Sequence, residues 1–481
     1  MPLTILTDAD VRTLLLSLTK EDILELQQSL ADALHYYSTS TEEDLNGCCS
    51  SLQPLRTALK RRDGQTTLFM PASSNDGLGV KIVTLADADT KKSKSDKTDS
   101  SSLASLESLS LSSHSQSTTS TATTADPPPS NLSSSQTTTP KGSLTLLDRH
   151  GNTRALINAE ELTAFRTALA STMLFKKRHN VHDLVVFGAG KQAYWHIRLA
   201  LLLRGPEIHH LNIINRTFHS ATSLIERLYK PSTEPSSFPA LNIPQPSATT
   251  LQFPKYQILT PHHTEYERLL KSTIRASSVI FCTTPSTTPL FPAGYITNTE
   301  GRKKGRYIAA IGSYKPHMLE LHPDILKQNV TPDHHHHHHK HAQQGGAIIV
   351  DSVEACLAEA GEIIQAGLTG NQVVEIGELI MLRRDAEDRR KEMGGFDKEG
   401  EGVDVGGVEL GEAKSKKSKK KKGGKEKEEG LDKEDQALVE WLQKGNVVYK
   451  SVGLGLMDVV VGSELVRLAD ERGIGIRVEN F

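Results

Sequence analysis

The most constraining feature of this chain is a short apolar run that leads directly into closely spaced glycines. The run covers 184–187, Gly188 and Gly190 follow it, and after Ala193 an apolar-periodic segment continues to about Arg204. This order predicts a strand, a tight turn and a helix. In that context the spacing G-x-G-x-x-A is typical of a turn that receives the diphosphate of a dinucleotide, because the amides at the helix N-terminus face the phosphates.

Each small residue of this turn has a physical role. Gly188 allows the sharp turn, Gly190 lets the backbone approach the diphosphate, and Ala193 keeps the helix close to the strand. Ala189 and Gln192 complete the predicted cofactor-binding turn. A purely structural glycine turn is the alternative interpretation.

The end of the next predicted strand bears on the choice of cofactor. It reads Asn215, Arg216 and Thr217, and we predict that these three residues contact the cofactor. An NAD-preferring site usually places Asp or Glu here to bind the ribose 2'-hydroxyl, whereas arginine suits a 2'-phosphate. We therefore expect NADP(H), with NAD(H) as the alternative.

Three later apolar runs predict further strands of the same parallel sheet. The runs are 277–284, 306–313 and 347–352. Ligands bind at the carboxyl ends of such strands, so Thr283, Thr284 and Ser313 are predicted to line the cofactor site. Loop capping is the alternative role for these hydroxyls.

Four stretches are too polar or too biased in composition to form a packed core. They are about 87–140, 230–254, 330–345 and 384–435. We predict that they are disordered or surface insertions. The histidine run 334–339 is interpreted as low complexity, and no metal site is expected. The lysine cluster 414–422 is interpreted as a solvated insertion, with a nuclear address or a weak polyanion contact as alternatives.

Outside the insertions, strand and helix patterns alternate, which indicates an α/β protein with a mostly parallel sheet. Asp8 is predicted to cap a first helix, and a second helix is expected over 20–37. Strands are expected at 67–72, 78–85 and 142–148. The last two are predicted neighbours whose connection carries the first insertion, because closure entropy grows only logarithmically with loop length.

Length and composition narrow the class of protein. A chain of 481 residues has room for two or three domains. The net charge of -2 offers no argument for nucleic acid as a partner. No apolar run approaches the roughly 18 to 20 residues that cross a bilayer, and the opening lacks a signal-peptide pattern, so we expect no membrane association and a cytoplasmic location.

The cysteines form neither a disulfide framework nor a zinc-binding pattern, and we expect them to be free thiols. They are Cys48, Cys49, Cys282 and Cys356.

Further stretches share their order with a known family. They are RTALK at Arg56, FMPASSNDGLGVKIVT around Lys81, GSLTLLDRHGNTRALINAEELTAFRTALAS through Arg166, VVFGAGKQA, NRT, VIFCTTPSTTPLF, IAAIGSYKPHMLEL, IIVDSVEACLAEAGEI and KSVGLGLMDVVVG. Together they resemble the ornithine cyclodeaminase/μ-crystallin family. The resemblance covers nearly everything outside the four insertions.

The resemblance implies a Rossmann-type dinucleotide-binding domain plus an α+β substrate and dimerisation domain built from both chain ends. The expected boundaries are 1–165 for the substrate domain, 166–442 for the Rossmann domain and 443–481 for a segment returning to the substrate domain. A homodimer joined through the substrate domains is also implied.

The resemblance further implies which residues act. Arg56, Lys81 and Arg166 match positions that line the substrate pocket and hold the carboxylate of an α-amino or α-imino acid. A guanidinium clamp suits that carboxylate, and a lysine can supply a proton. Residues of the loop beside the nicotinamide are expected to be Ser451, Val452 and Gly453, and Asp458 follows as a helix cap or structural anchor.

One departure from the cyclodeaminase pattern bears on the reaction. Tyr314 stands where the resemblance implies a cyclodeaminase aspartate, and it is expected to fill the pocket wall or to donate a hydrogen bond. The leading hypothesis is therefore an NADPH-dependent reductase of a C=N bond in a small cyclic imino acid. The alternatives are an ornithine cyclodeaminase with bound NAD and a non-catalytic protein that binds NADP or a small ligand.

Overall fold

The computed structural model describes residues 2–39, 53–62, 65–75, 77–86, 141–230, 254–330, 346–379 and 438–481. The four predicted insertions lie outside these residues except for a few residues at their ends. The histidine run, the lysine cluster, Cys48 and Cys49 also lie outside the described residues.

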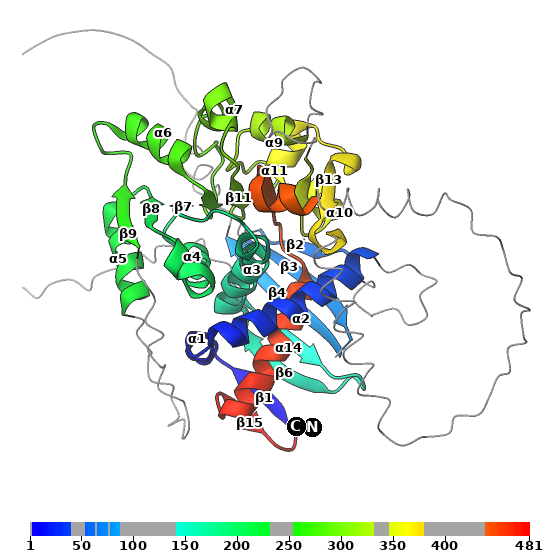
Figure 1. Cartoon of the computed structure of the whole chain (residues 1–481). Helices are drawn as coiled ribbons and strands as arrows, with labels where there is room; N and C mark the ends of the chain where they lie inside the picture. Colours follow the sequence, from blue (N-terminus) through cyan, green and yellow to red (C-terminus); the bar gives the residue numbers. More distant parts are fainter. Residues whose placement is uncertain are drawn as a thin grey trace, which may run out of the picture.

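The first of two sheets is built from both ends of the chain, as predicted. Within the described residues its seven strands follow the order β15-β1-β6-β5-β4-β3-β2. Figure 1 shows the N- and C-termini side by side at one end of this sheet. The strands are β1 (Leu3–Leu6), β2 (Thr57–Lys60), β3 (Gln65–Ser74), β4 (Gly77–Ala86), β5 (Lys141–Leu147), β6 (Thr153–Asn158) and β15 (Ile476–Val478).

The expected pairing across the first insertion is confirmed. β4 and β5 are antiparallel neighbours, in register from Leu78 opposite Leu147 to Thr84 opposite Lys141. The insertion therefore connects two adjacent strand ends. β6, which pairs with both β5 and β1, was not predicted from the sequence.

Four helices pack with this sheet: α1 (Asp8–Leu16), α2 (Lys20–Thr39), α3 (Ala159–Lys176) and α14 (Gly455–Arg472). The prediction that Asp8 caps α1 was wrong. Thr7 is the cap, because its side chain accepts from the backbone of Asp10 while the Asp10 carboxylate accepts from the backbone of Thr7. Asp8 lies inside the first turn.

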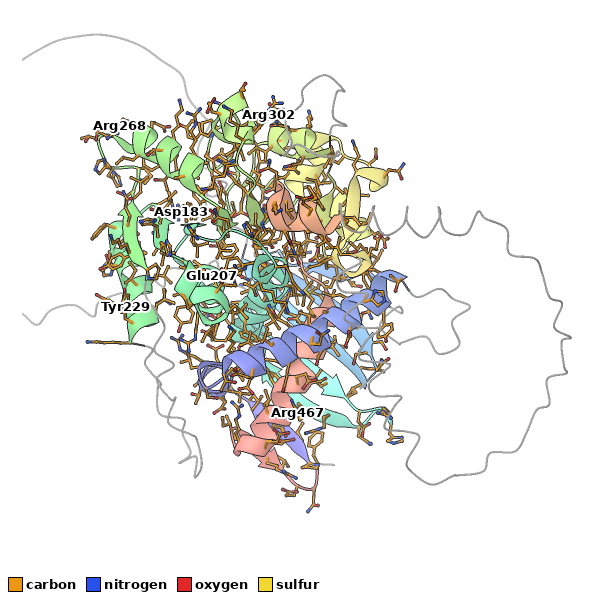
Figure 2. The ribbon with its side chains drawn as sticks, viewed as in Figure 1. Asp183, Glu207, Tyr229, Arg268, Arg302 and Arg467 are labelled. Atoms are coloured by element: carbon orange, nitrogen blue, oxygen red, sulfur yellow. The ribbon has the colours of Figure 1, made fainter. Side chains whose placement is uncertain are left out.

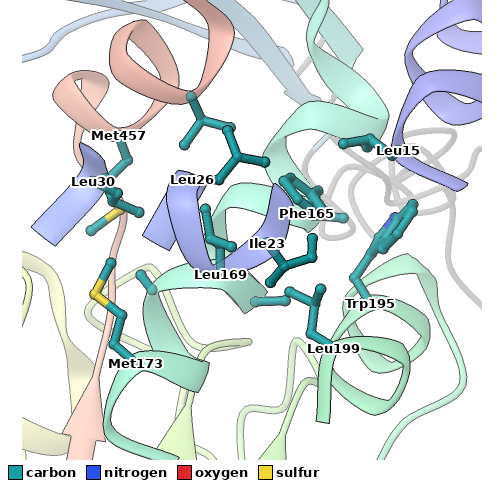
Figure 3. Packing of buried hydrophobic residues seen from close by; sticks show 14 of the residues in the cluster. Leu15, Ile23, Leu26, Leu30, Phe165, Leu169, Met173, Trp195, Leu199 and Met457 are labelled. Atoms are coloured by element: carbon teal, nitrogen blue, oxygen red, sulfur yellow. The ribbon is translucent and has the colours of Figure 1, made fainter. Parts of the chain in front are cut away.

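The main core lies between the helices of the first sheet and the nearest helix of the second. Figure 3 shows Leu26 of α2, Phe165 of α3 and Trp195 of α4 (Lys191–Arg204) meeting there. The Phe165 and Trp195 rings contact edge to face, with centroids 5.3 Å apart. Because α3 is buried along almost its whole length, it fixes the two sheets relative to each other.

The second sheet is parallel throughout, with the order β13-β12-β14-β11-β10-β7-β8-β9 in the described residues. Its strands are β7 (Asp183–Phe187), β8 (His210–Ile214), β9 (Lys255–Leu259), β10 (Val279–Cys282), β11 (Tyr307–Ala310), β12 (Ile348–Val350), β13 (Val373–Glu375) and β14 (Val447–Lys450). The order reverses between β7 and β10, which is where doubly wound sheets of the Rossmann type bind ligands.

Helices and short turns connect these strands. They are α5 (Phe218–Tyr229), α6 (Tyr266–Ala276), α7 (Gly294–Thr297), α8 (Thr299–Arg302), α9 (Pro323–Val330), α10 (Val353–Glu359), α11 (Gly361–Ala366), η3 (Gly205–Glu207), η4 (Gly370–Gln372) and η5 (Ile376–Glu378). No helix among the described residues is long and apolar enough to cross a membrane. Cys282 and Cys356 are buried and free, as expected.

The position of β14 differs from the expected return of the chain at 443. β14 hydrogen bonds between β11 and β12 in the second sheet, so only α14 and β15 join the first. The short loop between β14 and α14 is therefore a covalent junction between the two sheets. The domain boundaries otherwise stay a prediction.

Candidate active site

The glycine turn lies where β7 ends. Gly188 has a φ of +108°, a conformation that disfavours side chains, and a Cβ built on it would lie 2.8 Å from Thr283 Oγ1. Its amide donates to the Ile214 carbonyl at 2.9 Å. Gly188 therefore sits between the carboxyl ends of β8 and β10, and no larger residue fits.

The rest of the turn has the form of an anion cradle. Gly190 caps α4 without any side-chain hydrogen bond, and a Cβ there would meet nothing within 4 Å. The first amides of a helix lack partners within the helix and carry partial positive charge. Ala193 is buried in the main core and holds α4 close, while Ala189 and Gln192 flank the open space. This geometry fits a dinucleotide diphosphate.

The residues after β8 lie beside this turn. Asn215 Nδ2 donates to the Thr217 carbonyl at 2.8 Å, which shapes the chain before α5. Arg216 is exposed. The Gly188 amide bonds to Ile214, the last residue of β8, so the exposed Arg216 two residues further is placed to reach a group at the edge of a bound dinucleotide.

The hydroxyls at the ends of β10 and β11 differ in their surroundings. Thr283 Oγ1 donates to the Phe187 carbonyl at 2.6 Å, and the Thr284 amide donates to Glu320 at 2.7 Å. Ser313 is fully buried, and its hydroxyl bonds to Glu362 and Lys450. The Ser313 side chain therefore belongs to a buried polar network beneath the strand ends.

Glu320 joins this network through its backbone amide, which donates to Glu362 Oε1 at 2.8 Å. The Glu320 carboxylate also accepts the Gly312 amide at 2.7 Å, so it ties the ends of β10 and β11 together. Burial raises the pKa of Glu320 to about 7, while Lys450 opposes the shift and Glu362 adds to it. Lys450 Nζ lies 3.5 Å from Glu362.

The loop after β14 is held by Asp351, at the end of β12. Asp351 accepts from Ser451 Oγ and the Gly453 amide, both at 2.7 Å, and from the Val452 amide at 3.1 Å. Gly453 has a φ of +92°, and a Cβ there would lie 2.8 Å from Arg166 Nη2. The predicted cofactor loop therefore touches one of the predicted substrate residues.

Lys81 and Arg166 share one carboxylate in the interior. Lys81 Nζ lies 2.9 Å and Arg166 Nε 3.1 Å from Asp458 Oδ1. Lys81 comes from β4, Arg166 from α3 and Asp458 from the first turns of α14, and their side chains are 2%, 4% and 0% exposed. Asp458 is thus the counter-ion of both cations. Of the two roles expected for it, helix cap and structural anchor, this contact supports the structural anchor.

Electrostatics make the Lys81 ammonium a ready proton donor. Burial lowers its pKa to about 8, Asp458 opposes this, and Arg166 and Arg56 push in the same direction as burial. The guanidinium of Arg166 has its Nη1 only 3.4 Å from the Met457 sulfur, a weak acceptor. A small carboxylate would find strong donors on Arg166 and Lys81.

Arg56 completes the predicted trio from the segment before β2. Its Nε donates to Glu359 Oε1 at 2.6 Å, and burial lowers its pKa. Tyr314 packs against the cluster of Met70, Val83 and Leu85, and its place in the wall of a substrate pocket stays a prediction. A cavity of about 330 Å³ lined by Arg178, Lys304, Trp441 and neighbouring residues lies at the opposite edge of the second sheet and includes none of these groups.

Comparison with known proteins shows which sequences the chain is similar to. No protein-family model matches the chain. A Delta(1)-pyrroline-2-carboxylate reductase of Bacillus cereus is 24% identical over 437 residues, covering 89% of this chain and 90% of the reductase. An uncharacterized protein of Saccharomyces cerevisiae is 25% identical over 397 residues, covering 79% of this chain and 86% of that protein.

Solved structures show the same fold at low identity. The Thermococcus litoralis Delta(1)-pyrroline-2-carboxylate reductase, solved with NADH and L-proline, has a TM-score of 0.57 at 16% identity and covers 99% of this chain and 100% of its own. A lysine cyclodeaminase has a TM-score of 0.57 at 16% identity, covering 99% and 95%. An archaeal alanine dehydrogenase dimer with NAD has a TM-score of 0.56 at 15% identity, covering 100% of both chains.

The full-length matches to a reductase sequence, the shared fold and the predicted order of motifs agree. These findings agree with the resemblance to the ornithine cyclodeaminase/μ-crystallin family that the sequence indicates. Among the described residues, Lys81 and Arg166 meet on Asp458, and Arg56 lies within electrostatic reach of Lys81.

Sequence reasoning missed several residues of this candidate site. Asp351 directly follows a buried apolar strand, so its place at a carboxyl edge was a usable signal. Glu320 lies between two leucines, and Glu362 is followed by two isoleucines, so an acid beside apolar residues was a signal that the sequence analysis did not use. Glu359 is one of two acids on the short helix α10, and no pattern distinguishes it from Glu354.

Proposed function

We propose that the protein is an NADPH-dependent reductase of the C=N bond of small cyclic imino acids, of the ketimine or pyrroline carboxylate type. The observation that carries the proposal is the buried Lys81 ammonium, held by Asp458 beside Arg166 at the junction with the dinucleotide-type sheet. The names of the curated bacterial relatives support the same class of reaction.

The cofactor would bind along the carboxyl edge of the second sheet. Gly188 to Ala193 would hold its diphosphate, and Thr283 with the loop 451–453 would border its nicotinamide end. When bound, the cofactor supplies the hydride that reduces the imine carbon. NADP(H) is proposed over NAD(H) because Arg216, and no acid, follows Asn215 at the end of β8.

The substrate would bind between the loop that contains Gly453 and the three cations Arg56, Lys81 and Arg166. Arg166 and Arg56 hold its carboxylate, and Lys81 Nζ donates a proton to the substrate nitrogen. With a pKa of about 8, Lys81 is largely protonated at neutral pH yet releases its proton readily. Burial of the cluster excludes water and fixes the distances, which lowers the barrier by pre-alignment.

The test is absorbance at 340 nm with purified protein, NADPH or NADH, and a panel of cyclic imino acids. Imine-dependent loss of NADPH absorbance supports the proposal. Ornithine with NAD(+) and ammonia detection runs alongside: ammonia without net cofactor change would replace the proposal with cyclodeaminase chemistry. Cofactor binding without either reaction would favour a non-catalytic binding protein.

Arg216→Ala is expected to weaken NADPH binding by at least about tenfold and NADH binding little, because only NADPH carries the 2'-phosphate that the guanidinium would bind. Binding of both cofactors is measured by titration of their fluorescence. Lys230→Ala, at an exposed lysine after α5, serves as the charge-matched control. Equal losses for both cofactors would remove the 2'-phosphate assignment.

We also propose a homodimer formed through the first sheet. Leu78, Ile82 and Leu156 are exposed by 49%, 36% and 40% on the face opposite the buried Lys81, Val83 and Ile157. An apolar sheet face of this kind marks an interaction surface. The archaeal relative is described as a dimer.

Ile82→Glu is therefore expected to convert the dimer to a monomer, because it places a charge in the apolar interface. Size-exclusion chromatography with light scattering measures the mass. Leu24→Glu, at an exposed leucine of α2, is the matched control. A wild-type protein that is monomeric at all concentrations, or a variant that stays dimeric, would contradict this interface.

A further inference from the structure

Glu359 contacts Arg56, one of the three cations of the candidate site. Arg56 Nε donates to Glu359 Oε1 at 2.6 Å, and Arg56 Nη2 forms an ion pair with the other carboxylate oxygen. This two-point contact is the one that a guanidinium makes with a ligand carboxylate. Glu359 therefore occupies the edge of Arg56 that a substrate carboxylate would use.

The two partners come from different sheets and differ in exposure. Arg56 precedes β2 of the first sheet, whereas Glu359 ends α10, which follows β12 of the second. The Glu359 side chain is 31% exposed and that of Arg56 is 15% exposed. Glu359 can therefore turn into water at small cost, while the buried guanidinium continues to need an anion.

The neighbouring carboxylates are engaged elsewhere. Asp458 binds Lys81 and Arg166, and Asp351 accepts hydrogen bonds from Ser451 and the loop that follows it. Neither is available to exchange with a ligand without breaking buried contacts. Glu359 is the carboxylate whose contact with the cluster is partly open to solvent.

We propose that Glu359 is a specificity-determining residue, which competes with the substrate carboxylate for Arg56 and disfavours substrates with a second carboxylate. The inference rests on the proposed function, since it assumes that Arg56 receives the substrate. An internal competitor reduces the apparent affinity by the fraction of sites in which Arg56 is free. Once displaced, its negative charge stays at the rim of the site and repels a further anionic group.

The test measures binding of two probes to the full chain by calorimetry, with NADP(+) present. L-proline carries one carboxylate and L-aspartate carries two. Glu359→Gln is expected to bind L-proline at least about threefold more tightly and L-aspartate at least about 30-fold more tightly than wild type, because competition is removed for both and repulsion for L-aspartate alone. Glu354→Gln, at an exposed acid of the same helix, is the control and should match wild type.

Each outcome decides a separate claim. Unchanged or weaker L-proline binding by a folded Glu359→Gln protein overturns the inference, and so do equal gains for the two probes. Glu359→Asp, which keeps the charge on a shorter side chain, should keep much of the discrimination against L-aspartate. Tightened binding without reduction of any imine would overturn the proposed reaction and retain the role of Glu359. Failure of every protein to bind either probe would overturn both.

Discussion

Asp458→Ala is expected to lower the free energy of unfolding by about 3 to 5 kcal/mol, because removal of one partner leaves buried charges without compensation. Asp458 is fully buried and is the shared counter-ion of Lys81 and Arg166, whose side chains are 2% and 4% exposed. Neither cation can reach water without moving β4 or α3. Urea denaturation followed by circular dichroism measures the change.

Glu471→Ala provides a control on the same helix. Glu471 pairs with Arg467 at 2.8 Å, but both side chains are at least half exposed, and Figure 2 shows Arg467 on the outside of α14. Exposed pairs contribute little, so this variant should unfold close to wild type. A loss of less than about 1 kcal/mol in Asp458→Ala would show that the two cations find other compensation. A double-mutant cycle with Lys81→Met then measures how much of the loss comes from the Lys81 contact.

The fold was largely predictable because its signals are local and repeated. The glycine turn, the buried parallel strands and the helices between them each have a pattern in the sequence, and β4 and β5 were paired correctly across a long insertion. The errors came from local competition and from long-range pairing. Thr7, and not Asp8, caps α1 because Thr7 and Asp10 exchange hydrogen bonds. β14 lies in the second sheet between β11 and β12, which are far from it in sequence.

The candidate site was predictable only in part. The resemblance indicated Arg56, Lys81 and Arg166, but no spacing rule brings β4 and α3 onto one carboxylate of α14. The partner of Lys81 is 377 residues away in sequence, so packing alone reveals it. The same holds for Glu359, whose contact with Arg56 joins two sheets and has no sequence signature.

Lys81→Met is expected to lower kcat/KM for imine reduction by about 10²- to 10⁴-fold, the usual contribution of a positioned proton donor. Methionine approximates the length of the lysine stem and fits a buried position, while Asp458 keeps Arg166 as its partner. The cofactor turn at Gly188 belongs to the other sheet, so NADPH binding should stay near wild type. Steady-state kinetics at 340 nm and cofactor titration separate the two effects.

The pH profile tests whether Lys81 acts through its proton. Burial lowers its pKa to about 8, so the ammonium predominates below that pH and is lost as the pH rises through it. The wild-type rate should therefore fall above about pH 8, and this limb should vanish in Lys81→Met, while ionisation of the imine itself affects both proteins alike. Asp458→Asn should move the limb to lower pH, because Asp458 is the group that raises the pKa of Lys81. A limb that persists unchanged in Lys81→Met would assign the proton to another group.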